Sequence, residues 1–106
     1  MQDTRLNGPA LDAALSELNG WTVAADHGHI ARSWTFDSFA TAMAFWGKVA
    51  KLADQQDHHP ECLSLYTHIR IRLWTHDAGG LTHKDMTLAK AIDALVTGEF
   101  SNKLKS

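Results

Sequence analysis

Hydrophobic residues recur at helical spacing in three separate segments of the chain. The first segment has its apolar residues at i, i+3, i+4 and i+7: Leu11, Ala14, Leu15 and Leu18. This spacing predicts one apolar side of an amphipathic helix. Pro9 suits the first turn of that helix, where its missing N–H is not needed, and Gly20 suits its C-terminal end.

The second helical segment is the longest. Asp37 or Ser38 is a suitable N-cap. Apolar residues then keep helical spacing, with Phe45 widening the stripe: Phe39, Met43, Trp46, Val49, Ala50 and Ala53. Pro60 prevents the helix from continuing. We therefore expect a helix of about four turns or more that leads directly into His58-His59-Pro60.

The third helical segment lies near the C-terminus. Thr82 and Asp85 have the spacing of a capping box, with Asp in place of the usual Glu. The apolar stripe consists of Leu88, Ile92, Leu95 and Val96. Gly98 is expected to end this helix, and residues 101–106, like residues 1–8, are expected to be loose.

Between the helices, the pattern changes to that of strands. Residues 21–25 and 30–36 are rich in β-branched and aromatic side chains, and Gly28 between them is expected to supply the positive φ of a hairpin turn. From residue 63 to 76 the side chains alternate between two faces. One face carries Leu63, Leu65, Thr67, Ile69, Ile71, Leu73 and Thr75, and the other carries Tyr66, His68, Arg70, Arg72, Trp74 and His76. This segment is one long strand or two strands with a bend near Thr67-His68.

The predicted order is helix, two strands, helix, one or two strands, helix, within a single domain of residues 1–106. This order indicates an α+β fold with an antiparallel sheet whose helices cover one face. The opposite face would carry Arg70, Arg72 and Trp74. We expect that face to meet another subunit.

Composition narrows the class of protein. A chain of 106 residues with ten Lys and Arg against twelve Asp and Glu has a net charge of -2, which argues against direct nucleic-acid binding. Cys62 is the lone cysteine, so no intramolecular disulfide framework is possible. The sequence has no apolar run long enough for a membrane span, and we expect no signal peptide. We expect a small soluble protein of the cytoplasm.

Histidine is the residue type that most strongly indicates a chemical role, because the chain contains seven histidines and their side chains titrate close to neutral pH. His58 and His59 follow the long helix, and His76 ends the alternating segment. If the three converge, they can transfer protons near neutral pH, with Asp54 or Asp57 holding a ring nitrogen. Alternatively, the His-His pair only caps helix carbonyls. A metal site from His58 or His59, His76 and an Asp or Cys62 is less favoured, since neither HExxH nor CxxC spacing occurs.

These residues also resemble a known family. The matching segments are Asp54-Gln55-Gln56-Asp57-His58-His59-Pro60, Tyr66, Thr75-His76 and Asp85, with Leu18-Asn19-Gly20-Trp21, Phe36-Asp37-Ser38-Phe39, Phe45 and Val49-Ala50 around them. Together they are similar to the signature of the pterin-4a-carbinolamine dehydratases over nearly the whole chain. The resemblance implies three helices on one face of a four-stranded antiparallel sheet, in the order α-β-β-α-β-β-α. It also implies dehydration of 4a-hydroxytetrahydropterin to quinonoid dihydropterin, which recycles the cofactor of aromatic amino acid hydroxylases.

The resemblance implies a set of site residues. The catalytic positions would be His58, His59, His76 and the acidic Asp54, with no metal and no cofactor, since the pterin is the substrate. Substrate contacts would come from Asp57, His58, His59, Pro60, Trp74, Thr75, His76, Asp77 and Asp85. Our hypothesis is that His58 and His76 are the acid–base pair while His59 orients the pterin. Asp54 is commonly Glu in the family and Trp74 is commonly smaller, so both could alter the site.

The resemblance also implies partners. Family members assemble as homodimers or homotetramers, and a functional link to an aromatic amino acid hydroxylase is expected. A mammalian relative also serves as a dimerisation cofactor of a homeodomain transcription factor. A protein-binding role is therefore the first alternative function, and a pterin-binding protein with low turnover is the second.

Overall fold

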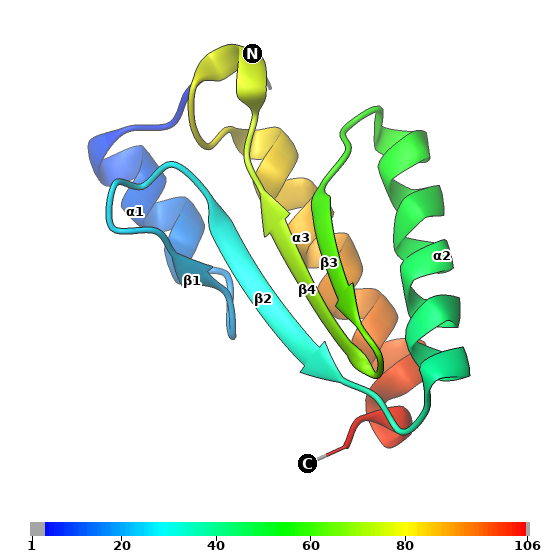
Figure 1. The fold of residues 1–106 in the computed structure, drawn as a ribbon. Coiled ribbons are helices and arrows are strands. Elements are labelled where there is room, and N and C mark those ends of the chain that lie inside the picture. Colours follow the sequence, from blue (N-terminus) through cyan, green and yellow to red (C-terminus); the bar gives the residue numbers. More distant parts are fainter. Residues whose placement is uncertain (1–3, 106) are drawn as a thin grey trace.

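The computed structural model describes residues 4–105 and shows one layer of helices on one face of an antiparallel sheet (Figure 1). The main elements are α1 (Gly8–Ser16), β1 (Thr22–Val23), β2 (Ile30–Thr35), α2 (Phe39–Gln56), β3 (Glu61–Leu65), β4 (His68–Leu73) and α3 (His83–Leu95). Three single turns complete the chain: η1 (His76–Ala78), η2 (Val96–Phe100) and η3 (Ser101–Lys103). The strand order is β1-β2-β4-β3, with every neighbouring pair antiparallel. The expected α+β fold is confirmed.

The long alternating segment folds as two strands. The chain turns at Tyr66 and Thr67, where Tyr66 takes a left-handed conformation with φ of 53°, so no glycine or proline marks the bend. Leu65 then pairs with His68 in the β3–β4 register. Because directly paired residues point to the same face, Leu63 and Leu65 lie beside Arg70 and His68 on the face away from the helices. The assignment of these two leucines to the core face was wrong.

The core lies between the sheet and the helices. From the sheet, it receives the fully buried side chains of Ile30, Ile69, Ile71 and Leu73, and from the helices those of Phe45, Val49, Leu88 and Ile92. Phe45 is at its aromatic centre, with ring centroids 4.8 Å from Phe36, 5.0 Å from Trp34 and 5.5 Å from Phe100. Burial of these large apolar surfaces is the dominant favourable contribution to folding.

One turn and one helix end differ from their predicted form. In the connection between β1 and β2, His27 has the positive φ of 59°, whereas Gly28 does not. The Gly28 N–H donates to Asp26 Oδ1 at 2.8 Å, and a Cβ on Gly28 would lie 2.9 Å from that oxygen. Because the Asp26 carboxylate ends a flexible side chain, it could move aside for a Cβ at this position. The first helix ends at Ser16, before Gly20, although Leu18 is still buried beyond the helix end.

α2 is the element that delivers the histidine pair. Ser38 is its N-cap, since its hydroxyl accepts a hydrogen bond from the Thr41 N–H at 3.1 Å. At the other end Asp57 adopts a left-handed conformation with φ of 50°. This turn breaks the helical path directly before His58. In the part of the chain that the structure describes, no helix is long and apolar enough to cross a membrane.

Both ends of the chain are hydrogen-bonded to the body of the fold. The Leu6 N–H donates to Leu81 O, and Leu6 is buried. The Lys105 N–H donates to Thr35 O, and the Asp37 N–H donates to Lys103 O, each at 2.8 Å. The expectation of loose termini therefore does not fit residues 101–105 or Leu6, while residues 1–3 and 106 lie outside the described residues. α3 itself ends at Leu95, and the chain passes Gly98 in a π-helical turn.

Candidate active site

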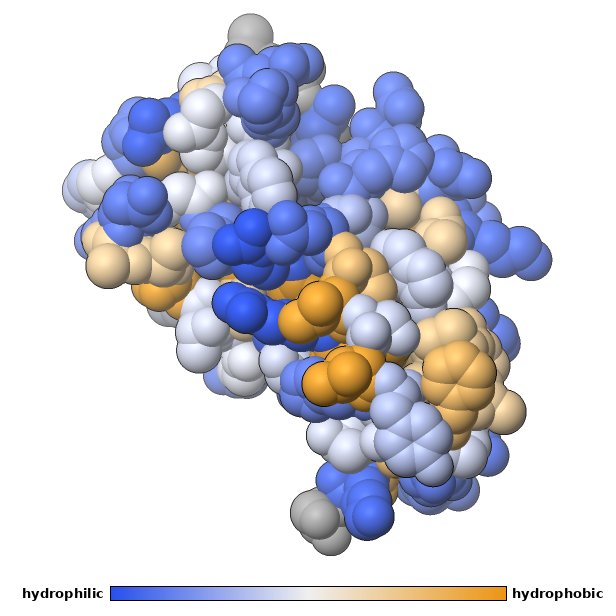
Figure 2. All heavy atoms as spheres, viewed as in Figure 1, coloured by the Kyte–Doolittle hydropathy of each residue, from blue (hydrophilic) through white to orange (hydrophobic). Residues whose placement is uncertain are grey.

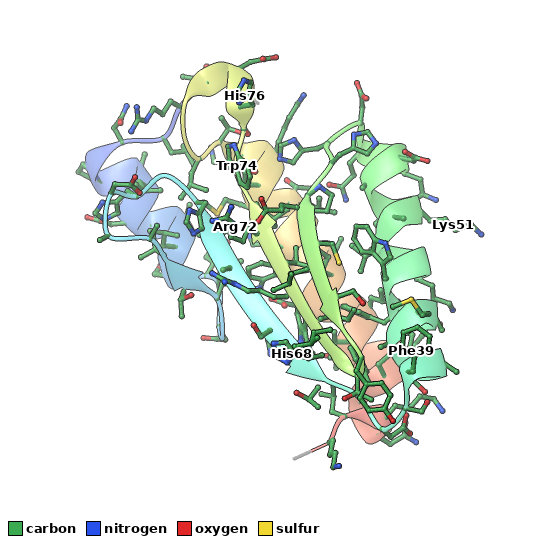
Figure 3. The ribbon with its side chains drawn as sticks, in the orientation of Figure 1. Phe39, Lys51, His68, Arg72, Trp74 and His76 are labelled. Atoms are coloured by element: carbon green, nitrogen blue, oxygen red, sulfur yellow. The ribbon has the colours of Figure 1, made fainter. Side chains whose placement is uncertain are left out.

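Three segments meet at the end of the sheet where β4 finishes: the α2–β3 connection, the segment after β4 and the first turn of α3. The antiparallel register places Leu73 opposite Ile30 and thus at the far end of β4 from His68. Figure 3 shows His76 and Trp74 at this end, above Arg72, with His68 at the other. We call the region formed by residues 54–60, 74–80 and 82–85 the histidine end.

His58 is the best-fixed histidine of this region. Its Nε2 lies 2.5 Å from Oδ1 of Asp85, and its backbone N–H donates to Ala53 O at 3.0 Å. The His58 side chain is 10% exposed, whereas that of Asp85 is completely buried. The contact joins the end of α2 to the start of α3 across 27 residues of sequence.

The Asp85 carboxylate is the centre of a buried hydrogen-bond network. Its Oδ2 lies 2.8 Å from Oγ1 of Thr75 and 3.0 Å from the backbone N of Thr82. The two threonine hydroxyls are 2.7 Å apart. The predicted capping box of Thr82 and Asp85 is confirmed. Thr75 and Asp85, both expected as substrate contacts, are buried beneath the surface.

His59 forms a second carboxylate pair, but on the surface. Its Nε2 lies 2.8 Å from Oδ1 of Asp54, and the two side chains are 62% and 81% exposed. Asp54 is therefore long enough to reach a histidine, in spite of being one methylene shorter than Glu. An exposed pair of this kind contributes only about 0–1 kcal/mol to stability.

His76 and Asp77 belong to η1 and are exposed. Backbone hydrogen bonds between Thr75 and Gly80 close the loop that carries them, the Thr75 N–H donating to Gly80 O at 2.9 Å. Thr75 belongs to the buried network and directly precedes His76 in the sequence, so the position of His76 depends on that network. Among residues 4–105, His58 alone of the three expected histidines is hydrogen-bonded to Asp85.

Trp74 is half-buried and held by neighbours that the sequence did not single out. The Arg72 guanidinium lies 5.3 Å from the centre of the indole ring, and the His29 ring meets it edge-on with centroids 6.4 Å apart. Arg72 in turn donates two hydrogen bonds to Glu61, which lower the pKa of that carboxyl and raise the pKa of Arg72. Ile30 pairs with Leu73, so the register of β2 and β4 brings His29 and Trp74 together, and no local sequence signal marks this contact.

Other candidate residues lie far from the histidine end or have side chains of low reactivity. Tyr66, placed by the alternating pattern on one face of the strand segment, is exposed at the β3–β4 turn, stacks on Phe39, and is at the opposite end of β4 from Thr75. Burial raises the pKa of the Cys62 thiol, which disfavours the nucleophilic thiolate. Within residues 4–105, no group of three or more His, Cys, Asp or Glu side chains is arranged to hold a metal ion.

The fold and the histidine end define a class: a small α+β protein in which imidazoles backed by carboxylates gather at one end of an antiparallel sheet. The family model described as pterin 4 alpha carbinolamine dehydratase matches residues 4–95. The chain therefore belongs to the pterin-4a-carbinolamine dehydratase family.

Named relatives agree with this membership. A Rhodospirillum rubrum protein named "Putative pterin-4-alpha-carbinolamine dehydratase" is 45% identical over 92 residues, which cover 87% of this chain and 96% of the relative. A Mesorhizobium japonicum protein of the same name is 42% identical over 93 residues, covering 88% and 95%.

Two solved structures share the fold. The Brucella melitensis protein described as a transcriptional coactivator/pterin dehydratase has a TM-score of 0.81 and 34% identity, over 87% of this chain and 98% of that one. A pterin dehydratase-like protein described as a RuBisCO assembly factor of the alpha-carboxysome has a TM-score of 0.62 at 23% identity, over 73% and 89%. The second similarity concerns the fold alone.

Proposed function

We propose that the protein dehydrates 4a-hydroxytetrahydropterin to quinonoid dihydropterin and water, and so recycles the cofactor of an aromatic amino acid hydroxylase. The observation that carries the proposal is the contact between His58 and the buried Asp85, which holds an imidazole firmly at the end of the sheet where His76 also lies. The family membership and the names of the relatives support the same reaction.

The reaction needs two proton transfers and no change of oxidation state. A proton reaches the hydroxyl oxygen on C4a, and the C4a–O bond breaks with its electron pair leaving as water. A second group removes the proton from N5, and the N–H electron pair forms the N5–C4a double bond. Two imidazoles can act as this acid and this base near neutral pH.

The three histidines divide into two roles in this proposal. His58 and His76 are the acid–base pair, while His59 orients the pterin and is itself held by Asp54. Asp57, Pro60 and Asp77 lie beside these histidines in the chain and would contact the substrate. Trp74, braced by Arg72 and His29, would form a wall of the site next to His76.

Turnover of the carbinolamine tests the proposal directly. An aromatic amino acid hydroxylase generates the 4a-hydroxytetrahydropterin, and its decay is followed by ultraviolet absorbance with and without the protein. We expect the protein to accelerate the decay, and we expect His59→Ala to raise KM more than it lowers kcat. A decay rate equal to that without protein, for a protein folded by circular dichroism, would contradict the proposed function.

The protein is also proposed to form a homodimer or homotetramer. The sheet face away from the helices exposes hydrophobic side chains beside strongly hydrophilic ones (Figure 2), and Leu63 and Leu65 on β3 are 55% and 69% exposed. Apolar side chains in this position favour a subunit contact. Light scattering at micromolar concentration should give a mass of two or four chains, and Leu65→Lys should lower it. A monomeric mass for the unmodified protein would exclude this assembly.

A protein-binding role remains the alternative function, and the description of the Brucella melitensis protein as a coactivator is the observation in its favour. The same exposed face with Leu63 and Leu65 would then contact a different protein. The two functions separate in the turnover assay. A folded protein without turnover that recovers a stoichiometric regulator from the source cell would support binding over catalysis.

A further inference from the structure

We propose that Asp85 is a positioning residue that fixes the tautomer of His58, so that Nδ1 is the nitrogen that His58 presents to the substrate. Asp85 itself is completely buried and cannot touch a bound molecule. The kinetic consequence rests on the proposed dehydratase function. The tautomer is a property of the protein alone and can be measured without any substrate.

The direction of every hydrogen bond in the buried network follows from the groups present. The Thr82 N–H can only donate, and it donates to Asp85 Oδ2. The Thr75 hydroxyl donates its one proton to the same oxygen, so the Thr82 hydroxyl must be the donor in the contact between the two threonines. The Thr82 oxygen accepts in turn from the Lys84 N–H at 3.2 Å. All donors therefore point toward the Asp85 carboxylate.

This arrangement decides which nitrogen of His58 carries its proton. An ionised carboxylate can only accept hydrogen bonds, so the atom that faces Oδ1 of the Asp85 carboxylate is an N–H. That atom is Nε2 of His58, 2.5 Å away. Neutral His58 therefore has its proton on Nε2 and a free lone pair on Nδ1.

The remaining nitrogen is free to act. In the part of the chain that the structure describes, Nδ1 of His58 makes no hydrogen bond, and Trp34 Nε1 is the buried side-chain polar atom without a partner. Nδ1 therefore reaches the surface through the exposed tenth of the side chain. A substrate proton would be taken or given there, while Asp85 keeps the ring from turning or changing tautomer.

Asp85→Asn is the sharpest test, because the network also dictates the orientation of the new amide. The position that receives two donors must hold the amide oxygen, so the NH₂ group must face Nε2 of His58. Nε2 then becomes the acceptor and the proton moves to Nδ1. Nitrogen-15 NMR of the imidazole should show protonated Nε2 in the unmodified protein and protonated Nδ1 in Asp85→Asn.

Thr82→Ala is the matched control. It removes the hydroxyl from the same network and from the helix cap, but leaves the contact between His58 and Asp85. We expect a lower melting temperature with the Nε2 tautomer retained. A purely structural role for Asp85 predicts the same behaviour for both variants, with no inversion in Asp85→Asn.

Kinetics complete the test. Asp85→Asn should lower kcat for dehydration roughly 10²-fold with little change in KM, because the reacting nitrogen carries the wrong proton. A protonated Nδ1 in the unmodified protein would overturn the proposal, and that measurement does not depend on any variant folding. If the tautomers are as expected but the unmodified protein has no turnover, the proposed function fails and the positioning role of Asp85 is retained.

Discussion

Replacing His58 or His76 by alanine should lower kcat for carbinolamine dehydration by about 10²- to 10⁴-fold in each case. The reason is that each side chain is proposed to move one of the two protons, and water at the site replaces a positioned imidazole poorly. His58→Ala also removes the partner of the buried Asp85 carboxylate. Structural disorder around Asp85 is therefore expected to contribute to the lower kcat of this variant.

The control is His68→Ala. His68 is at the opposite end of β4, where its Nδ1 lies 3.2 Å from Oγ1 of Thr35, so its loss should leave turnover nearly unchanged. All variants are compared by steady-state kinetics after circular dichroism has shown that they are folded. If both His58→Ala and His76→Ala keep the unmodified kcat, the acid–base assignment is wrong.

Phe45→Ala should have the largest effect on stability, lowering the free energy of unfolding by about 3–5 kcal/mol. The Phe45 side chain is completely buried and contacts the rings of Phe36, Trp34 and Phe100, so truncation loses apolar contacts and leaves a cavity. A domain of this size is stable by about 5–15 kcal/mol in total. The variant should therefore be close to unfolding at growth temperature.

Urea denaturation followed by tryptophan fluorescence measures this loss. Phe39→Ala on the same helix is the comparison, because Phe39 is half exposed and stacks on the exposed Tyr66. Its expected cost is about 1 kcal/mol or less. Equal losses in the two variants would show that the aromatic cluster around Phe45 is not the centre of the core.

Much of the fold could be predicted because the local signals agree with the tertiary contacts. Ser38 and the Thr82–Asp85 pair cap helices through short-range hydrogen bonds, which depend on sequence spacing alone. Leu63 and Leu65 were misplaced for the opposite reason. The pairing of Leu65 with His68 depends on where the chain turns. Tyr66 forms that turn in a left-handed backbone conformation, which a tyrosine in the sequence does not predict.

Which residues form the histidine end could be predicted, but how deeply each side chain is buried could not. The family resemblance pointed to His58, His59, His76 and Asp85 as site residues, whereas spacing alone left the convergence of the three histidines open. Neither signal could show that Asp85 is buried beneath His58, because that depends on how the first turn of α3 packs against the end of α2. Likewise, the contact of His29 with Trp74 follows from the register of β2 and β4, which is a long-range property.

The way the two ends of the chain are attached has a practical consequence for affinity tags. The Leu6 N–H is bonded to Leu81 O, one residue before the Thr82 cap, and the Arg5 side chain packs over Gly80. Lys105 is bonded to Thr35, which the antiparallel register places at the opposite end of the sheet. Figure 1 shows the first and last described segments of the chain at opposite ends of the molecule. A fusion partner is therefore best attached after Lys105, at the end of the sheet opposite His58 and His76, whereas one attached before Arg5 would begin beside the loop that carries His76.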